Sequence, residues 1–290
     1  MAPFAGSSGS SGHAALLLAF LAGAATAALL IGRQALFGRR QRQRVIGIIP
    51  ARYASSRFPG KPLVQILGKS MIQRTYEQAK KATLLDRVVV ATDDDSIRQE
   101  CERFGAEVIM TSAACPNGTV RCHEALQRCG GQYDLVVNLQ GDEPLVDPVI
   151  IDGIVAALQA APDAVLSTAV TALPSDDVQN RNRVKCVVDR NSYALFFSRG
   201  MLPHNKSGAV DPTYPYLLHL GFYCFDAAFL GTYCALPDSA LQLAEDLEQL
   251  KVLENGHRIK VIAVEHDAHG VDCPEDVPKI EELMRKKGIA

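Results

Sequence analysis

The sequence predicts an α/β protein with a mostly parallel sheet, followed by a mixed α+β extension. Between residues 45 and 140, short β-branched runs (VIGII, RVVVAT, AEVIM and DLVVNLQ) alternate with segments of helical periodicity, such as 71–85 and 96–104. The runs are apolar almost throughout, which is typical of parallel strands that helices cover on both faces. Polar loops follow the runs directly, and in such sheets ligands bind beyond the carboxyl ends of the strands.

Three of these loops carry charged groups. The first predicted strand leads into residues 50–63, the second into ATDDD at 91–95, and DLVVNLQ leads into LQGDEP at 139–144. Because the carboxyl ends of parallel strands meet at one edge of a sheet, we expect the three loops to share one rim.

The second half of the chain is less regular. RVKCVVD, YALFFSR and HLGFYCF have the composition of strands, with no helix between each pair, so we expect an extension with antiparallel pieces. IKVIAVEH predicts one more strand. CPEDVPKIEELMRKKG predicts a closing helix, with a proline near its start and lysines at its end.

Size and charge narrow the class of protein. With 290 residues, 48% of them hydrophobic, the chain can bury a full core, and we expect one globular domain over 45–290. Residues 1–44 carry five arginines and no acid, so the rest of the chain has 25 basic against 32 acidic side chains. A general nucleic-acid binder needs a basic face, so no nucleic acid is expected as a partner, and any polyanion site must be local.

The 8 cysteines show neither a CxxC pair nor a Cys/His spacing that suits zinc. This pattern indicates a reducing compartment without a disulfide framework. Cys115, Cys122 and Cys129 are evenly spaced around a predicted helix, which favours buried thiols over metal ligands.

The N-terminal segment predicts a membrane anchor. Residues 1–12 are rich in Gly and Ser, as in a disordered tail, and 13–32 contain the uncharged run 14–31, long enough to span a bilayer as a helix. The arginines of a basic linker, 33–44, follow the run, which favours a single-pass anchor with the globular domain in the cytosol. A cleaved signal peptide and an organellar targeting sequence are the alternatives. A mitochondrial outer membrane or an endomembrane would suit such an anchor.

The loop after the first strand is strongly cationic. Arg52, Ser55, Arg57 and Lys61 place charges and hydroxyl donors within ten residues, next to small residues that let a backbone approach phosphate. The loop has neither GxxxxGK[ST] nor GxGxxG. It is therefore interpreted as a phosphate site of another kind, or as a solvated turn.

Two separate aspartates could hold a divalent cation opposite this loop. Asp142 follows Gly141 at the end of a strand, and Asp272 lies in HGVDCPED after the last one. Carboxylates face a phosphate chain only with a cation between them, and Mg²⁺ binds through one or two carboxylates plus phosphate oxygens. The alternatives are an ordinary turn residue for Asp142 and a helix cap for Asp272.

Other polar groups are candidates for recognition. Asn117 and Gly118 form a turn signal, and Thr119 could cap the helix that follows. The irregular half contains Arg199, His219, Tyr223, Glu248 and Gln249, and a hydroxylated sugar acid would bind to such a mixture of cation and amides. The alternative is a structural role for each of these residues.

Taken together, these motifs resemble one family. IIPARYASSRFPGKPL, VVVATDD, NGTVR, VNLQGDEP, VKCVVD, YALFFSR, HLGFYCF, LEQLKVLENG and GVDCPEDV occur in the order and approximate spacing of the CMP-Kdo synthetases, the 3-deoxy-manno-octulosonate cytidylyltransferases. The match runs from Val45 to near the C-terminus. The anchor lies outside it and resembles the leader of plant members.

The resemblance implies a Rossmann-like nucleotidyltransferase fold, a homodimer formed through the second half, and Mg²⁺ as cofactor. It implies that Arg52, Lys61, Asp142 and Asp272 are catalytic, with the two aspartates as metal ligands. It also implies which residues bind the two substrates, CTP and Kdo. The residues implied to bind the nucleotide are Ala51, Arg52, Ser55, Lys61, Asn117, Gly118, Thr119 and Arg121. The residues implied to bind Kdo are Gln140, Arg199, His219, Tyr223, Glu248 and Gln249.

The expected reaction is in-line attack of the Kdo C2 hydroxyl on the α-phosphorus of CTP, with pyrophosphate leaving. One departure concerns the nucleotide turn: the family has an acid where this chain has Val120, and usually Ser where it has Asn117. The alternatives are an enzyme that activates sialic acid or another sugar acid, and a catalytically silent, membrane-tethered sugar-nucleotide binder.

Overall fold

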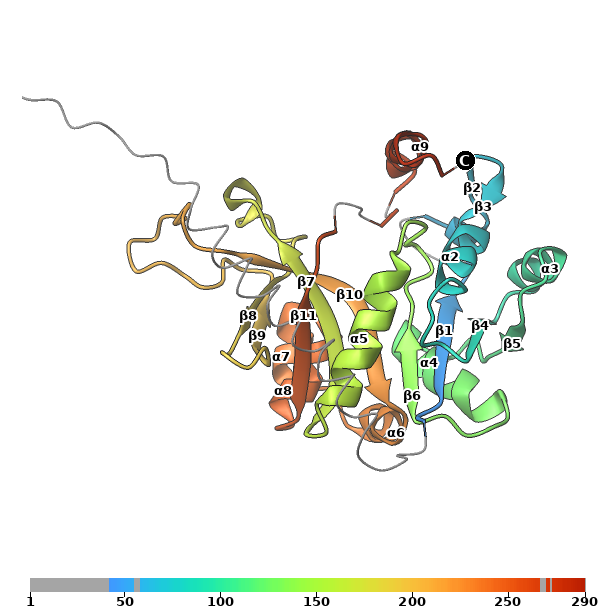
Figure 1. Ribbon diagram of the computed structural model, residues 1–290, viewed down its shortest axis with the longest axis horizontal. Helices are drawn as coiled ribbons and strands as arrows, with labels where there is room; N and C mark the ends of the chain where they lie inside the picture. Colours follow the sequence, from blue (N-terminus) through green and yellow to red (C-terminus); the bar gives the residue numbers. More distant parts are fainter. Residues whose placement is uncertain (1–41, 55–57, 267–269, 272, 290) are drawn as a thin grey trace, which may run out of the picture.

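A computed structural model describes residues 42–54, 58–266, 270–271 and 273–289, which form a sheet of nine strands with helices on both faces (Figure 1). All pairings along the main path are parallel except those of β10, so the mostly parallel sheet is confirmed. From one edge to the other, the path runs β11 (Arg258–Ala263), β7 (Ala164–Ala172), β10 (Leu217–Asp226), β6 (Leu135–Asn138), β1 (Val45–Ala51), β4 (Arg87–Thr92) and β5 (Val108–Met110).

The position of β10 is the main difference from the sequence-based prediction. We expected HLGFYCF within the extension, whereas it belongs to a ten-residue strand between β6 and β7, antiparallel to both. Only β8 (Lys185–Val188) and β9 (Ala194–Ser198) form the predicted antiparallel extension, which joins the sheet through β8 and β10. The second half of the chain therefore completes the central sheet.

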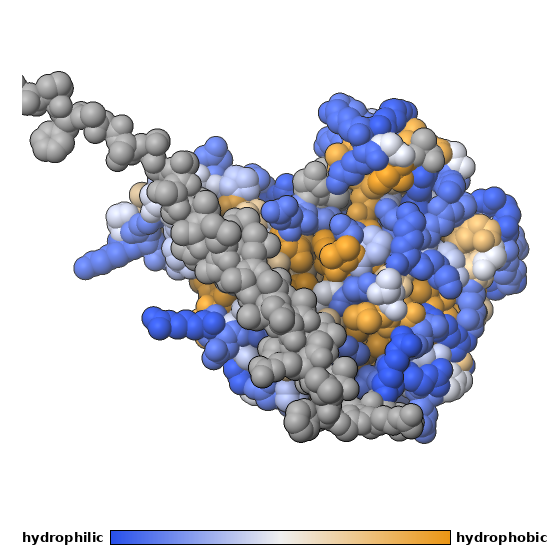
Figure 2. All heavy atoms as spheres, viewed as in Figure 1, coloured by the Kyte–Doolittle hydropathy of each residue, from blue (hydrophilic) through white to orange (hydrophobic). Residues whose placement is uncertain are grey.

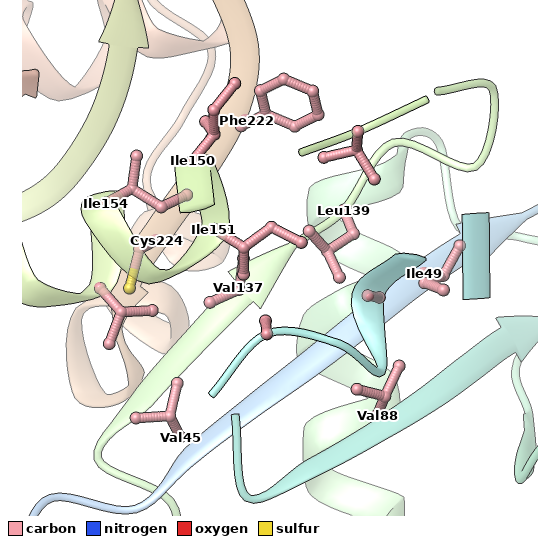
Figure 3. Packing of buried hydrophobic residues seen from close by; sticks show 14 of the residues in the cluster. Val45, Ile49, Val88, Val137, Leu139, Ile150, Ile151, Ile154, Phe222 and Cys224 are labelled. Atoms are coloured by element: carbon pink, nitrogen blue, oxygen red, sulfur yellow. The ribbon is translucent and has the colours of Figure 1, made fainter. Parts of the chain in front are cut away.

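Apolar side chains of β1 point alternately to the two faces of the sheet, and helices cover both faces. Val45 and Ile49 pack into one core cluster with α2 (Met71–Ala79), α3 (Asp95–Arg103) and α5 (Pro148–Ala160), part of which is drawn in Figure 3. Ile46 and Ile48 point to the other face, into a cluster with α4 (Gly118–Arg128), α6 (Ala227–Ala235) and α8 (Glu248–Glu254). Burial of each such side chain contributes about 1.5–3 kcal/mol, which anchors β1 and the loop that follows it.

The helix α2 ends six residues earlier than its periodicity predicts, at Ala79 instead of residue 85. The carboxylate of Asp152 on α5 accepts hydrogen bonds from the backbone nitrogens of Thr83 (2.9 Å) and Leu84 (2.8 Å). These bonds hold the chain in a turn, so a contact with a distant helix decides where α2 stops. The predicted helix at 96–104 is confirmed within one residue, as α3.

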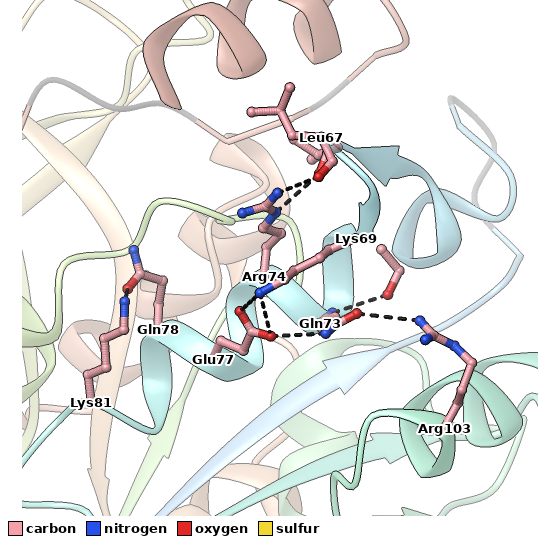
Figure 4. Close-up of polar contacts among 10 residues, drawn as sticks. Leu67, Lys69, Gln73, Arg74, Glu77, Gln78, Lys81 and Arg103 are labelled. Carbon is pink, nitrogen blue, oxygen red and sulfur yellow. Dashed lines mark hydrogen bonds and ion pairs between the residues drawn. The ribbon is translucent and has the colours of Figure 1, made fainter. Parts of the chain in front are cut away.

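A third, smaller cluster connects the C-terminus to the start of the domain. The predicted closing helix, α9 (Asp276–Lys286), lies beside the hairpin of β2 (Gln65–Ile66) and β3 (Lys69–Ser70; Figure 1). Ile280 and Met284 of α9 belong to one buried cluster with Ile66 of β2. The buried Arg74 of α2 supports this hairpin, because its guanidinium donates to the carbonyl oxygens of Ile66 (3.1 Å) and Leu67 (2.8 Å; Figure 4).

The cysteines are free thiols, and Cys115, Cys122 and Cys129 are all buried, as predicted. The face in Figure 2 is largely hydrophilic, with apolar patches near its middle, over α5. Within the described residues, no helix has the length and apolar character needed to cross a bilayer. The predicted tail (1–12), the predicted anchor (13–32) and most of the linker (33–41) lie outside the described residues.

Candidate active site

A pocket of about 280 Å³ lies where β1 and β6 end and α4 begins. It is lined by three loops: the one after β1, the turn before α4 and the turn after β6. Many of the predicted site residues meet there, although they come from distant parts of the sequence. They are Ala51, Arg52, Lys61, Asn117, Gly118, Arg121, Gln140 and Asp142.

The three loops approach closely at Pro50. A Cβ atom added to Gly141 would lie 3.1 Å from the carbonyl oxygen of Pro50, and one added to Gly118 would lie 3.2 Å from its Cγ. Gly60 has a φ of +67°, the left-handed region that favours glycine, and it leads into the 3₁₀ turn Lys61–Leu63. Glycines at these positions allow the basic and acidic loops to meet.

The loop after β1 and the turn after β6, which were expected to share one rim, are joined by an ion pair. The Lys61 ammonium nitrogen lies 2.6 Å from Oδ2 of Asp142, and the two side chains are only 14% and 33% exposed. A pair with this little access to water is screened less than a surface salt bridge. The basic and acidic loops thus present a cation and a carboxylate side by side.

Of the two predicted metal ligands, the structure describes Asp142. Asp272 and the loop residues Ser55 and Arg57 lie outside the described residues. Among the residues that are described, no cluster of three or more His, Cys, Asp or Glu side chains could hold a metal ion. The backbone nitrogen of Val271 donates to the carbonyl oxygen of Asp142 at 3.0 Å, so the C-terminal segment reaches the acidic turn. Carboxylate oxygen is also the donor that Mg²⁺ prefers, so the chemistry of the site fits this ion.

Arg121 is the buried cation of the predicted nucleotide site and lies in the first turn of α4. Its side chain is 4% exposed, and Nη1 lies 2.5 Å from Oγ1 of Thr111 and 3.2 Å from Oδ1 of Asp93. Asp93 belongs to the ATDDD loop, which therefore joins the predicted rim through Arg121. Burial of an arginine needs such partners, so Asp93 holds the guanidinium in place.

A hydrogen-bonded chain of side chains links the predicted nucleotide turn to the second half of the protein. Asn138 Nδ2 donates to Oγ1 of Thr119 (3.1 Å), whose hydroxyl donates to Oε2 of Glu248 (2.6 Å). Burial raises the pKa of Glu248, and the Thr119 hydroxyl counteracts this by stabilising the carboxylate. Thr119 thus touches a residue predicted for the sugar acid while it stands in the predicted nucleotide turn.

The predicted sugar-acid residues on β10 have polar partners within the core. The hydroxyl of Tyr223 donates to Oε1 of Gln249 (3.1 Å), while Nε2 of Gln249 is buried without a partner among the described residues. The ring of His219 lies 5.6 Å from that of Tyr223, and burial lowers the pKa of His219 to about 3. Gln140 lies beside this strand, since a Cβ on Gly221 would be 3.8 Å from its Cγ.

Arg199 is separate from the other predicted sugar-acid residues. Its guanidinium donates to the carbonyl oxygens of Glu245 (2.7 Å) and Asp246 (3.1 Å) at the end of α7 (Ala240–Glu245). Its own carbonyl oxygen accepts from the buried Lys185 at 2.6 Å. In this conformation Arg199 ties α7 to the end of β9, and its described contacts involve none of the other five residues of the predicted set.

Sequence reasoning missed Asp93, Asn138 and Thr168 as partners of site residues. Asp93 belongs to the motif ATDDD, and Asn138 directly precedes LQGDEP. Both residues lie at the end of a predicted strand, and this position could have indicated their role. No sequence pattern indicates Thr168, because it lies in the middle of β7 and meets the distant His219 only once the chain has folded.

Comparisons with known proteins agree with the geometry. The family model described as cytidylyltransferase matches residues 46–259. The chain is 60% identical over 286 residues to the mitochondrial 3-deoxy-manno-octulosonate cytidylyltransferase of Arabidopsis thaliana, with 98% of each chain covered. It is 64% identical over 248 residues to the 3-deoxy-manno-octulosonate cytidylyltransferase of Zea mays, covering 86% of this chain and 83% of the maize protein.

A solved structure extends the comparison to the fold. A CMP:2-keto-3-deoxy-manno-octonic acid synthetase complexed with CTP superposes with a TM-score of 0.80 at 35% identity. The superposition covers 84% of this chain and 99% of the other.

Proposed function

The chain belongs to the 3-deoxy-manno-octulosonate cytidylyltransferases, and from this premise we infer that it transfers CMP from CTP to 3-deoxy-D-manno-octulosonate (Kdo) and releases pyrophosphate. The observation that carries the inference is the meeting of Lys61 and Asp142 at 2.6 Å in the pocket between three loops. A cation for the phosphate chain and a carboxylate for a divalent ion are the two groups that such a transfer needs at the α-phosphate.

In the proposed reaction, the C2 hydroxyl oxygen of Kdo attacks the α-phosphorus of CTP while the bond to the bridging oxygen of pyrophosphate breaks. Arg52 and Lys61 bind the phosphate chain and stabilise the charge that develops on it. Ala51, Ser55, Asn117, Gly118, Thr119 and Arg121 are proposed to position the nucleotide. Catalysis rests on positioning and charge, since phosphoryl transfer needs little covalent help.

We propose that Asp142 and Asp272 hold Mg²⁺. When bound, this ion neutralises phosphate charge and favours loss of the sugar hydroxyl proton. The proposal is supported by the hydrogen bond from Val271 to the carbonyl of Asp142, because Val271 precedes Asp272 in the sequence.

The sugar acid is proposed to bind near β10 and the start of α8. Gln140, His219, Tyr223, Glu248 and Gln249 supply amides, a hydroxyl, an imidazole and a carboxylate for its hydroxyl groups. Arg199 is also proposed to bind the sugar acid, and in this conformation its guanidinium donates to the carbonyl oxygens of Glu245 and Asp246.

Pyrophosphate release tests the function. The full chain should release pyrophosphate with CTP, Kdo and Mg²⁺, and the sugar product should carry CMP. Sialic acid in place of Kdo should give little product. Equal turnover of both sugars would show an enzyme of broader specificity, and no turnover of either would contradict catalysis.

We also propose that residues 14–31 hold the enzyme in a mitochondrial outer membrane or an endomembrane, with the domain facing the cytosol. The mitochondrial name of the Arabidopsis relative supports a mitochondrial location, since the match covers 98% of this chain. Imaging of the full-length chain with a C-terminal tag, with and without residues 1–44, tests the location.

A homodimer formed through the second half is proposed as well. Its support is the exposure of apolar side chains there, since Leu195 on β9 is 60% exposed and Leu243 on α7 is 66% exposed. Sedimentation of residues 42–290 should show a dimer, and Leu195→Lys with Leu243→Lys should weaken it. A monomer at all concentrations would contradict the proposal.

A further inference from the structure

The hydroxyl of Thr168 lies at the one irregular point in the pairing of β7 with β10. The register shifts between Leu220 and Tyr223, directly beside Thr168, which is fully buried. Its Oγ1 lies 2.8 Å from the carbonyl oxygen of Phe222, 3.1 Å from that of Leu220 and 3.0 Å from Nε2 of His219. One hydroxyl group thus meets two backbone acceptors and one ring nitrogen.

The proton count decides the direction of each bond. A threonine hydroxyl has one proton and two lone pairs, whereas a carbonyl oxygen can only accept. If the proton pointed at His219, both carbonyl oxygens would face the lone pairs of Oγ1 at 2.8 and 3.1 Å, which is repulsive. The hydroxyl therefore donates to a carbonyl, and the ring nitrogen Nε2 must donate to Oγ1.

We propose that Thr168 fixes His219 as the tautomer protonated on Nε2, so that Nδ1 accepts a hydrogen bond from a hydroxyl group of the sugar acid. This rests on the proposed function, which places His219 in the sugar pocket. Thr168 is then a positioning residue that acts through His219 and does not itself touch the substrate.

The surroundings of the ring support a fixed, neutral acceptor. Phe197 packs edge-on against the imidazole, with ring centroids 4.9 Å apart, and Tyr223 lies on the same strand at 5.6 Å. Among the described residues, the only polar contact of the ring is the one from Nε2 to Thr168. Burial lowers the pKa of His219 to about 3, so the ring carries no charge near neutral pH.

The tautomer has a consequence for substrate choice. A neutral Nδ1 without a proton repels a carboxylate and attracts a hydroxyl proton. His219 therefore recognises a hydroxyl group of the sugar, and the carboxylate of the sugar acid must bind elsewhere. Sugar acids that lack the recognised hydroxyl would leave Nδ1 unpaired on binding, which costs affinity.

The direct test is the tautomeric state of the wild-type ring. A long-range ¹H–¹⁵N correlation spectrum of the ¹⁵N-histidine-labelled protein should show His219, assigned by its loss in His219→Gln, as the neutral Nε2–H form. The Nδ1–H form or a charged ring near neutral pH would overturn the proposal. This measurement needs no variant of Thr168 to fold and no catalysis.

A kinetic test separates the effect of the Thr168 hydroxyl on the tautomer of His219 from its effect on packing. Thr168→Val should raise KM for Kdo about tenfold, the effect of one lost hydrogen bond, with KM for CTP unchanged. Thr168→Ser should restore both KM and the Nε2–H signal. Thr171→Val, on the same strand, is the control for loss of a buried threonine hydroxyl and should leave KM for Kdo unchanged.

Two further outcomes are distinguishable. If His219→Gln and Thr168→Val leave KM for Kdo unchanged, the recognition role is overturned, while continued CMP-Kdo formation keeps the proposed function intact. If Thr168→Ser behaves like Thr168→Val although both fold, the methyl group matters instead of the hydroxyl, and the proposal is also overturned.

Discussion

The side-chain nitrogen of Lys61 and Oδ2 of Asp142 lie 2.6 Å apart, which joins the loop after β1 to the turn after β6. The pair places a positive charge against the carboxylate that is proposed to bind Mg²⁺. Binding of a nucleotide triphosphate would offer Lys61 a competing partner and leave Asp142 able to bind the ion.

The first prediction concerns the two aspartates. Asp142→Asn and Asp272→Asn keep the size of each side chain and remove its charge, so each should lower Mg²⁺-dependent kcat by about three orders of magnitude. Pyrophosphate release with varied Mg²⁺ measures this. Asp95→Asn is the control, because among the described residues this exposed carboxylate pairs with Arg98 alone, on the surface of α3, and its loss should leave kcat unchanged. Near-normal kinetics in either site variant would remove the metal assignment.

The second prediction separates Lys61 from the metal. Lys61→Ala should lower kcat about 100-fold or more with a smaller change in KM for CTP, because the lysine stabilises charge that develops during transfer. Lys61→Arg should recover little, since a planar guanidinium cannot replace a compact ammonium in a site this enclosed. A pure increase in KM would instead assign Lys61 to ground-state binding.

The third prediction concerns the close approach at Pro50. Gly141→Ala places a methyl group 3.1 Å from a backbone carbonyl, so the acidic turn must move by a few tenths of an ångström. We expect at least about a tenfold loss of kcat with little change in thermal stability. Gly231→Ala on α6 is the matched control, since its Cβ would make an ordinary contact at 3.4 Å. Full activity of Gly141→Ala would show that the turn tolerates the shift.

The fourth prediction uses the raised pKa of Glu248. An acid whose pKa is higher in the folded than in the unfolded state stabilises the fold below its unfolded pKa, and this contribution is lost as pH rises through the folded pKa. Glu248→Gln should therefore increase the free energy of unfolding relative to wild type at about pH 8 and have less effect at about pH 4. Urea unfolding at the two pH values measures the difference. An equal effect at both pH values would contradict a raised pKa of Glu248 in the folded state.

The strands and the rim could be predicted because their signals are local. The apolar runs at 45–49 and 87–92 fix buried strands, and the loops that follow each strand must then meet at one edge. Asp142, Lys61 and Asn117 met in the pocket for this reason. The end of α2 could not be predicted, since it depends on hydrogen bonds to Asp152, which lies on another helix.

The residues of the second half were harder to place for a related reason. The positions of His219 and Tyr223 depend on where β10 pairs and on its register shift, and no pattern in HLGFYCF encodes either. For Arg199, the motif predicts the position in the chain but not the direction of the side chain. The guanidinium is held by hydrogen bonds to the carbonyl oxygens of Glu245 and Asp246.

The antiparallel strand in the middle of the sheet has a consequence for how the enzyme can be divided. Since β10 lies between β6 and β7, a fragment that ended after β7 would expose unpaired backbone along both of those strands. A second half exchanged between relatives would therefore have to bring a β10 whose side chains fit β6 of the recipient, because the two parts of the chain share one sheet.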